Sequence, residues 1–184
     1  ENPERKLVYV IAFPTVEARQ KSFAAFGQDP AWQKARAESE ANGPLVAKIE
    51  SQLMRATEFS PALKPMPASE RVYELRTYTA SPNCLEHLNA RFANHTLKLF
   101  EKHGMTNVVY WNLVKDQKSA ENTLIYLLAH KSVEAARASF NAFRQDPDWL
   151  AARKASEEKA GGSLTVPEGV KSVFLKATDY SPMK

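Results

Sequence analysis

The chain has 184 residues, 43% of them hydrophobic and 25% charged, with a net charge of +4 from 25 Lys and Arg against 21 Asp and Glu. This composition is typical of a globular protein of one domain or two small ones, and it excludes a large multidomain enzyme. Charges of both signs are interleaved and only six glycines occur, which argues against a nucleic-acid partner.

The longest apolar run, Leu7 to Phe13, is far shorter than the roughly 18 residues that a membrane span needs. We therefore expect a soluble protein with no transmembrane segment. The single cysteine, Cys84, excludes an intrachain disulfide, but it leaves the cellular compartment open.

An internal repeat organises the chain. The segment that starts at Leu7 aligns with the one that starts at Leu124, and both contain a QDPxW box, ending at Trp32 and Trp149. About half of the aligned positions are identical, too many for chance. The match resumes further on with four extra residues in copy two, within GGSLTVPEG, and we place this insertion in a loop.

Copy one contains only the back half of the repeat. We predict a strand over 7–13, a broken helix from Val16 to about Ala41 and a strand over 47–59. Residues 1–61 form this half-repeat, and the proline-containing segment 62–70 reads as a linker. A sheet of two strands with one helix is marginal alone, so we expect the missing half to precede Glu1 in the natural protein.

Copy two, residues 71–184, reads as a complete unit of alternating strands and helices. A strand over 72–79 leads to a helix capped by Ser81 and Pro82, which ends at His103 and Gly104. The other expected elements are a hairpin over 107–114 and 123–129, a helix capped by Ser132 that restarts at Asp146 and Pro147, and a strand over 171–179. The order βαββαβ is the ferredoxin-like α+β pattern, whose second sheet face needs a partner.

The first strand of copy two carries the main candidate site. We predict that Tyr73, Leu75 and Thr77 pack against the helices, so that Glu74, Arg76 and Tyr78 line a cleft on the other face. Arg76 would hold a carboxylate or enolate, and Glu74 would position or deprotonate it. A buried ion pair at an interface explains the same pattern and is the commoner structural outcome.

Aromatic and histidine residues complete the candidate set. Tyr110, Trp111 and Tyr126 would shape an apolar cavity or simply form core.

Three histidines of the first predicted helix, His87, His95 and His103, recur every eight residues. Each such step turns the helix by about 80° and rises by roughly 12 Å, so the three side chains cannot share a metal ion. His103 reads as a helix C-terminal cap and His95 as a packed or pocket-edge residue. His130 aligns with Phe13, which argues against a role in both copies. Cys84 lies near a helix N-terminus but has no partners for a nucleophile.

Several segments of copy two resemble the NIPSNAP family: RVYELRTYTA, RFANHTLKLFEKHGMTNVVYWNL, NTLIYLLAH, FRQDPDW and SVFLKATDYSP. The resemblance covers nearly the whole chain outside the linker. It implies a dimeric α+β barrel, in which ferredoxin-like units pair sheet to sheet, either within the chain or in a homo-oligomer. It also associates tandem members with export from bacterial cells.

Three function classes stay open at this point, because the activity of the resembled family is not established and fold does not transfer function. The first is a small-molecule-binding or scaffolding module. The second is a cofactor-independent oxygenase or isomerase that acts on a small acidic metabolite, with Arg76 as clamp and Glu74 or His95 as base. The third is a haem or tetrapyrrole carrier with His95 or His130 as ligand. We assign no catalytic residue, no cofactor and no metal site.

Overall fold

The computed structural model describes residues 5–64 and 71–183. These residues divide into two compact units, with the boundary between Ser51 and Gln52. The predicted limits of the repeat at 61 and of the linker at 62–70 stay predictions, because residues 65–70 lie outside the described part of the chain.

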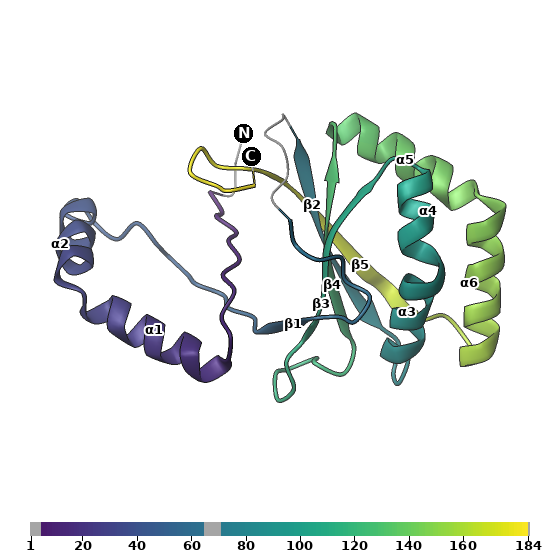
Figure 1. The fold of residues 1–184 in the computed structure, drawn as a ribbon, viewed down its shortest axis with the longest axis horizontal. Helices are drawn as coiled ribbons and strands as arrows, with labels where there is room; N and C mark the ends of the chain where they lie inside the picture. The colour runs from purple at the N-terminus through teal and green to yellow at the C-terminus, as the bar shows by residue number, and fades with distance from the viewer. Residues whose placement is uncertain (1–4, 65–70, 184) are drawn as a thin grey trace. The chain divides into compact units, whose positions relative to one another are not determined.

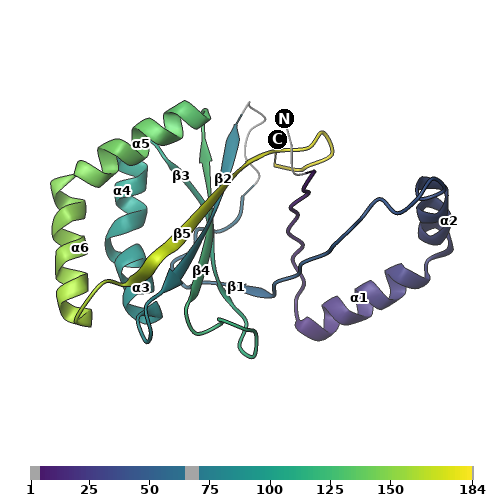
Figure 2. The same ribbon diagram turned by 180° about the vertical axis from the view of Figure 1, so that it is seen from behind.

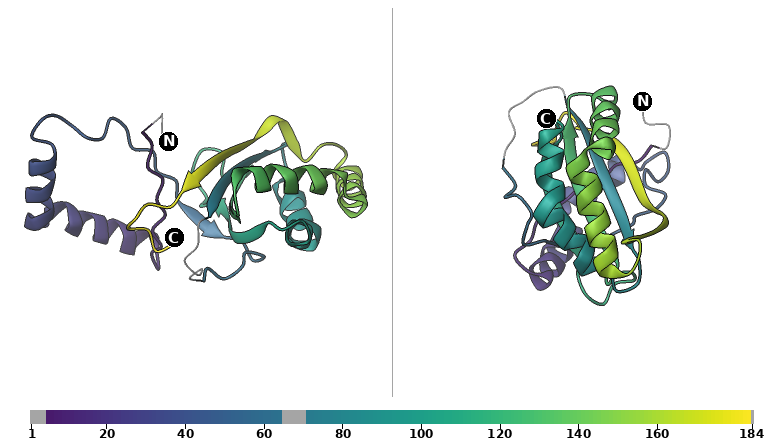
Figure 3. Two further views of the ribbon diagram at one scale, coloured as in Figure 1. Left: turned by 90° about the horizontal axis from the view of Figure 1, so that it is seen from above. Right: turned by 90° about the vertical axis from the view of Figure 1, so that its right-hand side faces the viewer.

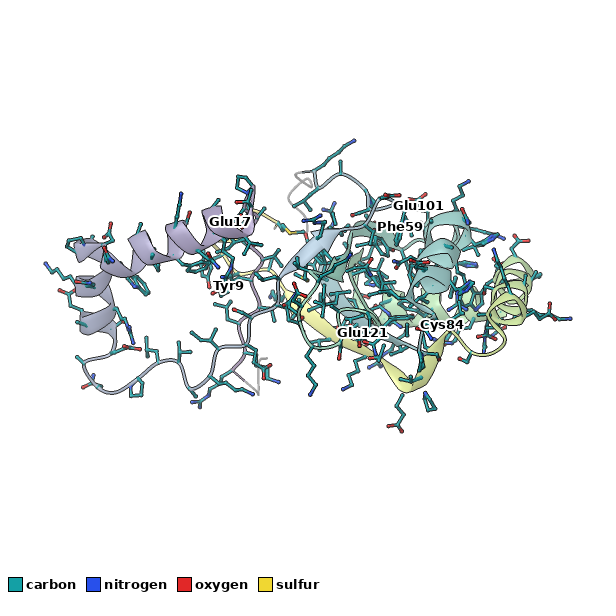
Figure 4. The ribbon with its side chains drawn as sticks, turned by 90° about the horizontal axis from the view of Figure 1, so that it is seen from below. Tyr9, Glu17, Phe59, Cys84, Glu101 and Glu121 are labelled. Atoms are coloured by element: carbon teal, nitrogen blue, oxygen red, sulfur yellow. The ribbon has the colours of Figure 1, made fainter. Side chains whose placement is uncertain are left out.

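The first unit contains a helix that breaks and restarts, as the sequence predicts. Helix α1 (Val16–Gln28) is capped by Thr15, and α2 (Pro30–Ser39) begins after Asp29, whose Oδ1 accepts a hydrogen bond from the Trp32 amide. None of residues 16–39, all of which are described, is buried. Figure 4 shows their side chains projecting from the two helices on several sides.

The strand predicted over 7–13 is wrong, because these residues form no regular secondary structure. Leu7, Tyr9 and Ile11 are all more than half exposed. Their counterpart in copy two is a central strand with partners on both sides, and copy one has no counterpart of those partner strands in the sequence. Without a neighbouring strand to pair with, the backbone amide and carbonyl groups of an extended segment form hydrogen bonds with water instead.

The second unit has a five-stranded antiparallel sheet with helices on one face (Figure 1). Its strand order is β1-β3-β4-β2-β5, and the order of the last four is that of a ferredoxin-like βαββαβ unit. The α+β prediction is therefore confirmed. The strands are β1 (Met54–Ala56), β2 (Val72–Ala80), β3 (Thr106–Leu113), β4 (Thr123–His130) and β5 (Thr165–Lys176).

The strand predicted over 47–59 shortens to β1, which pairs with the edge strand β3 through Met54 and Leu113. By contrast β5, which holds the aligned segment of copy two, pairs with β2. In Figure 2 the long β5 runs beside β2 at the opposite edge of the sheet. The end of copy one thus joins the sheet of the second unit.

The helical layer consists of two broken helices. The first comprises α3 (Leu85–Arg91), a π-helical turn η1 (Phe92–Thr96) and α4 (Leu97–Lys102), and it ends at Gly104 with a left-handed φ of 76°. The second comprises α5 (Val133–Gln145), capped by Ser132, and α6 (Pro147–Ala160), capped by Asp146. Figure 3 shows α5 and α6 crossing in front of the sheet when the molecule is seen from the right-hand side.

Boundaries in copy two differ from the predicted ones by more than one residue at three places, and one of these is the end of the last strand, which was predicted at 179 and lies at Lys176. The helix predicted to begin at Ser81 and Pro82 begins at Leu85, because Asn83 has a φ of 60° and the Cys84 amide bonds the Ser81 carbonyl in a turn. The insertion predicted as a loop lies largely in β5, which starts at Thr165 and continues along β2 through an irregularity in register. Gly169 belongs there because a Cβ at this position would come within 2.8 Å of the Thr79 and Val166 carbonyl oxygens.

Buried apolar side chains form one cluster on each face of the sheet. Phe92, Phe100 and Phe143 lie in the cluster between sheet and helices, together with Tyr110 and Tyr126 of β3 and β4. Tyr73 and Leu127 belong to the cluster on the other face. Because both faces bury apolar residues, the alternation of a strand alone does not tell which face meets the helices.

Candidate functional site

Glu74, Arg76 and Tyr78 face the helices, so the predicted orientation of β2 is wrong. Tyr78 makes an edge-to-face contact with Phe92 of η1, and the guanidinium carbon of Arg76 lies 4.3 Å from the centre of the Phe140 ring of α5. Tyr73 lies in the apolar cluster of the opposite face, with Leu75 packed against it. The charged side of the strand is therefore the one that the helical layer covers.

Arg76 is the centre of a buried polar network. Its Nη1 donates to Glu74 Oε1 at 2.5 Å, its Nε to the Tyr126 hydroxyl at 2.9 Å and its Nη2 to the Tyr78 hydroxyl at 3.3 Å. The Arg76 side chain is 13% exposed and that of Glu74 only 3%. A guanidinium with partners on three nitrogens and an aromatic ring against it is held in one orientation.

Glu74 also contacts His130, which comes from the end of β4. The Nε2 of His130 lies 3.1 Å from Glu74 Oε2. Burial acts to raise the pKa of Glu74, but the hydrogen bond from His130 and the charge and hydrogen bond of Arg76 together outweigh it, so the pKa is lowered. The His130 Nδ1 is buried without a hydrogen-bond partner. Glu74 is thus a carboxylate that accepts from two sides.

Tyr110 of β3 and Tyr126 of β4 pack against each other beside this network. The rings of Tyr110 and Tyr126 stack with centroids 4.9 Å apart, and Phe92 packs against both. Burial raises the pKa of Tyr126 well above its ordinary value. Tyr126 therefore stays protonated near neutral pH and accepts the hydrogen bond from Arg76 without carrying charge.

A cavity of about 310 Å³ opens above this network, between α5 and the strands β2 and β5. Glu74 and Arg76 line it from β2, and Ser172 and Phe174 line it from β5. The α5 side contributes Ala136, Arg137, Phe140, Asn141 and Arg144. The cavity therefore combines two aromatic side chains, Phe140 and Phe174, with three arginines and one carboxylate.

The other predicted site residues lie elsewhere. Trp111 packs against the apolar cluster of the opposite sheet face, since it neighbours Tyr110 on an alternating strand. His95 is exposed on the π-helical turn. Tyr78, Tyr110, Tyr126 and His130 belong to or border the buried network but do not line the cavity. Cys84, labelled in Figure 4, is buried and directly precedes α3.

Seven lining residues were not among the predicted ones: Ala136, Arg137, Phe140, Asn141, Arg144, Ser172 and Phe174. The repeat itself holds a signal that could have found the three polar residues on α5, which are Arg137, Asn141 and Arg144. Copy one keeps the aromatic counterparts of α5, Phe23 and Phe26, but it replaces these three polar residues. These three polar residues are therefore specific to copy two, and this difference could have drawn attention to them.

Asp146 holds a second, structural cluster at the junction of α5 and α6. Its Oδ2 lies 2.8 Å from Lys102 Nζ and 2.7 Å from His103 Nε2, and its Oδ1 accepts from the Asp148 amide. Hydrogen bonds from Lys102 and from His103 hold the pKa of Asp146 well below its usual range. His103 ends α4 as predicted, and its ring ties that end to the second broken helix.

We expect Asp146→Asn to lower stability at neutral pH while keeping the helix cap, because asparagine also caps. A carboxylate with a depressed pKa stabilises the fold above its unfolded pKa, about 3.9, and this contribution disappears as the pH falls through the folded pKa. The gap in urea midpoint between wild type and variant should therefore close on acidification. Asp148→Asn, at a residue 73% exposed, is the control with a smaller gap. If the urea midpoints of wild type and D146N keep the same separation as the pH falls, the Asp146 carboxylate does not stabilise the fold through its lowered pKa.

Neither a membrane-spanning helix nor a metal-binding group is found in the described part of the chain. Over residues 5–64 and 71–183, no helix has the length and apolarity to cross a membrane. The same residues contain no cluster of three or more His, Cys, Asp or Glu side chains suited to a metal ion.

Comparison with known proteins places the chain in a family. A family model described as NIPSNAP matches residues 3–61 and 73–182, so the chain belongs to the NIPSNAP family, as the resemblance of its motifs implied. The match extends over both copies of the repeat. A search among curated proteins found no match.

Three bacterial proteins of known structure are similar in fold to this chain. An uncharacterised NIPSNAP-like domain protein from Burkholderia xenovorans shares 16% identity over 61% of this chain and 90% of its own, with a TM-score of 0.50. A NIPSNAP family protein of unknown function from Agrobacterium tumefaciens shares 17% over 62% and 95%, also at 0.50. Another from that bacterium shares 13% over 66% and 98%, at 0.53. Identities this low show the fold alone.

Proposed function

We propose that the second unit is a small-molecule-binding module and that its ligand occupies the cavity between α5, β2 and β5. The observation that carries the proposal is Arg76, a buried and fully oriented guanidinium that borders this cavity. Nothing in the packing of the core requires a charge there, since an apolar pair of similar volume is often as stable as a buried ion pair. A preorganised cation beside aromatic walls suits recognition of a ligand.

A second candidate, enzymatic proton transfer, has one specific observation in its favour. Glu74 and His130 form a buried pair at 3.1 Å whose second imidazole nitrogen has no partner. Glu74 is the member of this pair that lines the cavity, and it lies beside the Arg76 guanidinium, an arrangement suited to removing a proton beside a carbonyl and stabilising the enolate. The tetrapyrrole-carrier alternative has less support, because His95 is exposed and Glu74 occupies the Nε2 of His130.

Self-association through the sheet face opposite the helices also stays a prediction. That face carries the second apolar cluster, which includes Tyr73, Val109 and Leu127. Such pairing would leave the cavity accessible, because the cavity lies on the helical side of the sheet.

Filling the cavity tests the binding proposal. We expect a mixed panel of small acids, amines and neutral compounds to contain binders that shift the backbone amide resonances of Ala136, Phe140 and Ser172. Ser172→Trp should abolish these shifts, because the indole would occupy the cavity from β5. Lys171→Trp is the matched control, since its side chain points to the other face of the same strand. Binding that survives S172W, or a panel without any binder at these amides, would refute the proposal.

A further inference from the structure

We infer that the ligand of this cavity is a small organic anion with an apolar body, and that Arg137 and Arg144 select it. This inference rests on the proposed binding function and adds the chemical class of the ligand. It also confines the anion site to the second copy of the repeat. Three sets of observations carry it: the helical spacing, the local charge and the difference between the two copies.

The lining residues of α5 follow one face of the helix. Arg137, Phe140, Asn141 and Arg144 stand at i, i+3, i+4 and i+7, the spacing that places side chains above one another on a helix surface. Two cations therefore flank the aromatic Phe140 along the mouth of the cavity. Phe174 of β5 supplies a second aromatic group.

The charge around the cavity is unbalanced. Its charged lining consists of Glu74 and three arginines. The Glu74 carboxylate already accepts hydrogen bonds from Arg76 and His130. It therefore does not neutralise the two arginines of α5. Neither Arg137 nor Arg144 forms an ion pair with a carboxylate in the described part of the chain, although Arg137 acts electrostatically on Glu134 one turn earlier. Arg144 donates to the Asn141 side chain. An anion would receive charge-assisted hydrogen bonds from such groups.

The two copies agree where the scaffold needs them and differ at this site. Phe140 and Phe143 have the counterparts Phe23 and Phe26 in copy one. The residues that align with Arg137, Asn141, Arg144 and His130 are Gln20, Ala24, Gly27 and Phe13. Each of these four differences removes a polar or cationic group that copy two places in or beside the cavity, whereas the remaining α5 lining residue, Ala136, aligns with the cation Arg19. The two arginines at positions 137 and 144 are thus a property of copy two and not of the repeated fold.

The test compares phenylacetate with its neutral isostere phenylacetamide on the full chain, by amide shifts at Ala136, Phe140 and Ser172. We expect phenylacetate to bind at least about tenfold more tightly than phenylacetamide, and we expect its affinity to fall as salt is added. Arg144→Gln and Arg137→Gln, the latter installing the residue of copy one, should each weaken phenylacetate binding about tenfold and leave phenylacetamide unchanged. Lys154→Gln, on the exposed side of α6, is the control with the same change in net charge.

The outcomes separate the two proposals. If phenylacetamide binds in the cavity as tightly as phenylacetate, or if R137Q and R144Q bind phenylacetate as the wild type does, the ligand class is wrong while the binding site stands. If neither compound shifts the cavity amides, the anion inference is overturned. In that case, binding of any other panel member that S172W removes would still support the proposed function.

Discussion

Replacing Phe143 by alanine is expected to destabilise the second unit by about 3–5 kcal/mol, the range for truncating a buried phenylalanine. Phe143 is 5% exposed and joins the two broken helices, with its ring centre 4.9 Å from that of Phe100 and 4.5 Å from that of Trp149. The alanine would leave a cavity that aromatic neighbours cannot fill by small movements. Urea-induced unfolding, followed by circular dichroism, measures the loss.

The repeat supplies a matched control for this variant. Phe26 is the counterpart of Phe143 and keeps the same aromatic partner, with its ring centre 4.5 Å from that of Trp32, yet it is 48% exposed. Phe26→Ala should therefore cost about 1 kcal/mol or less. Equal losses for the two variants would contradict the assignment of Phe143 to the core of the second unit and of Phe26 to an exposed surface.

Arg76→Met is expected to lower the free energy of unfolding by roughly 3 kcal/mol, because it removes one member of a buried ion pair and leaves the Glu74 carboxylate with His130 as its remaining side-chain partner in the network. Methionine keeps much of the volume, so packing against Phe140 survives in part. Without Arg76, the pKa of Glu74 would be higher than in the wild type, because burial raises it and only His130 would still oppose that effect. The loss should therefore shrink at lower pH, where Glu74 is protonated more easily.

The double variant Glu74→Gln with Arg76→Met separates charge from packing. It leaves no unpaired charge under α5, so it should recover a large part of the stability that R76M loses. Thr77→Val, on the opposite face of the same strand, is the control for a substitution in β2. If the double variant is no more stable than R76M, the effect of Arg76 is one of packing and the buried network does not depend on its charge.

The elements of the fold that sequence patterns predicted are those defined by local signals. The break between α5 and α6 at Asp146 and Pro147 follows from a cap residue and a proline in adjacent positions, and the same pair produces the break after α1. The β3–β4 hairpin follows from two β-rich runs around a polar loop. The start of α3 was mispredicted because helix propensities do not show that Asn83 adopts a left-handed backbone conformation here.

The sequence predicted the central residues of the candidate site correctly, but it placed them on the wrong face of the sheet. The alternation of β2 correctly grouped Glu74, Arg76 and Tyr78 on one face, because side chains of a strand point to opposite sides in turn. It assigned that face to the wrong side of the sheet, since Tyr73 and Leu75 look like the more suitable core. What makes the charged face suitable for burial is a set of partners from distant segments, His130, Tyr126 and Phe140, and no local pattern reveals them.

By itself the sequence predicted the α+β class and the order of the elements of copy two, because both are encoded in spacing along one chain. The self-similarity at a fixed offset indicated a repeat, and the resemblance of the motifs implied the family. Only the tertiary structure decided which sheet face the helices cover, that residues 7–13 form no strand, and that α5 and β5 build the cavity over Arg76. The physical reason is that burial of a charge and pairing of a strand are satisfied by partners far away in sequence. A residue's own neighbours in the chain fix its conformation, and its neighbours in space fix whether a charge, a backbone amide or a ring can be buried there.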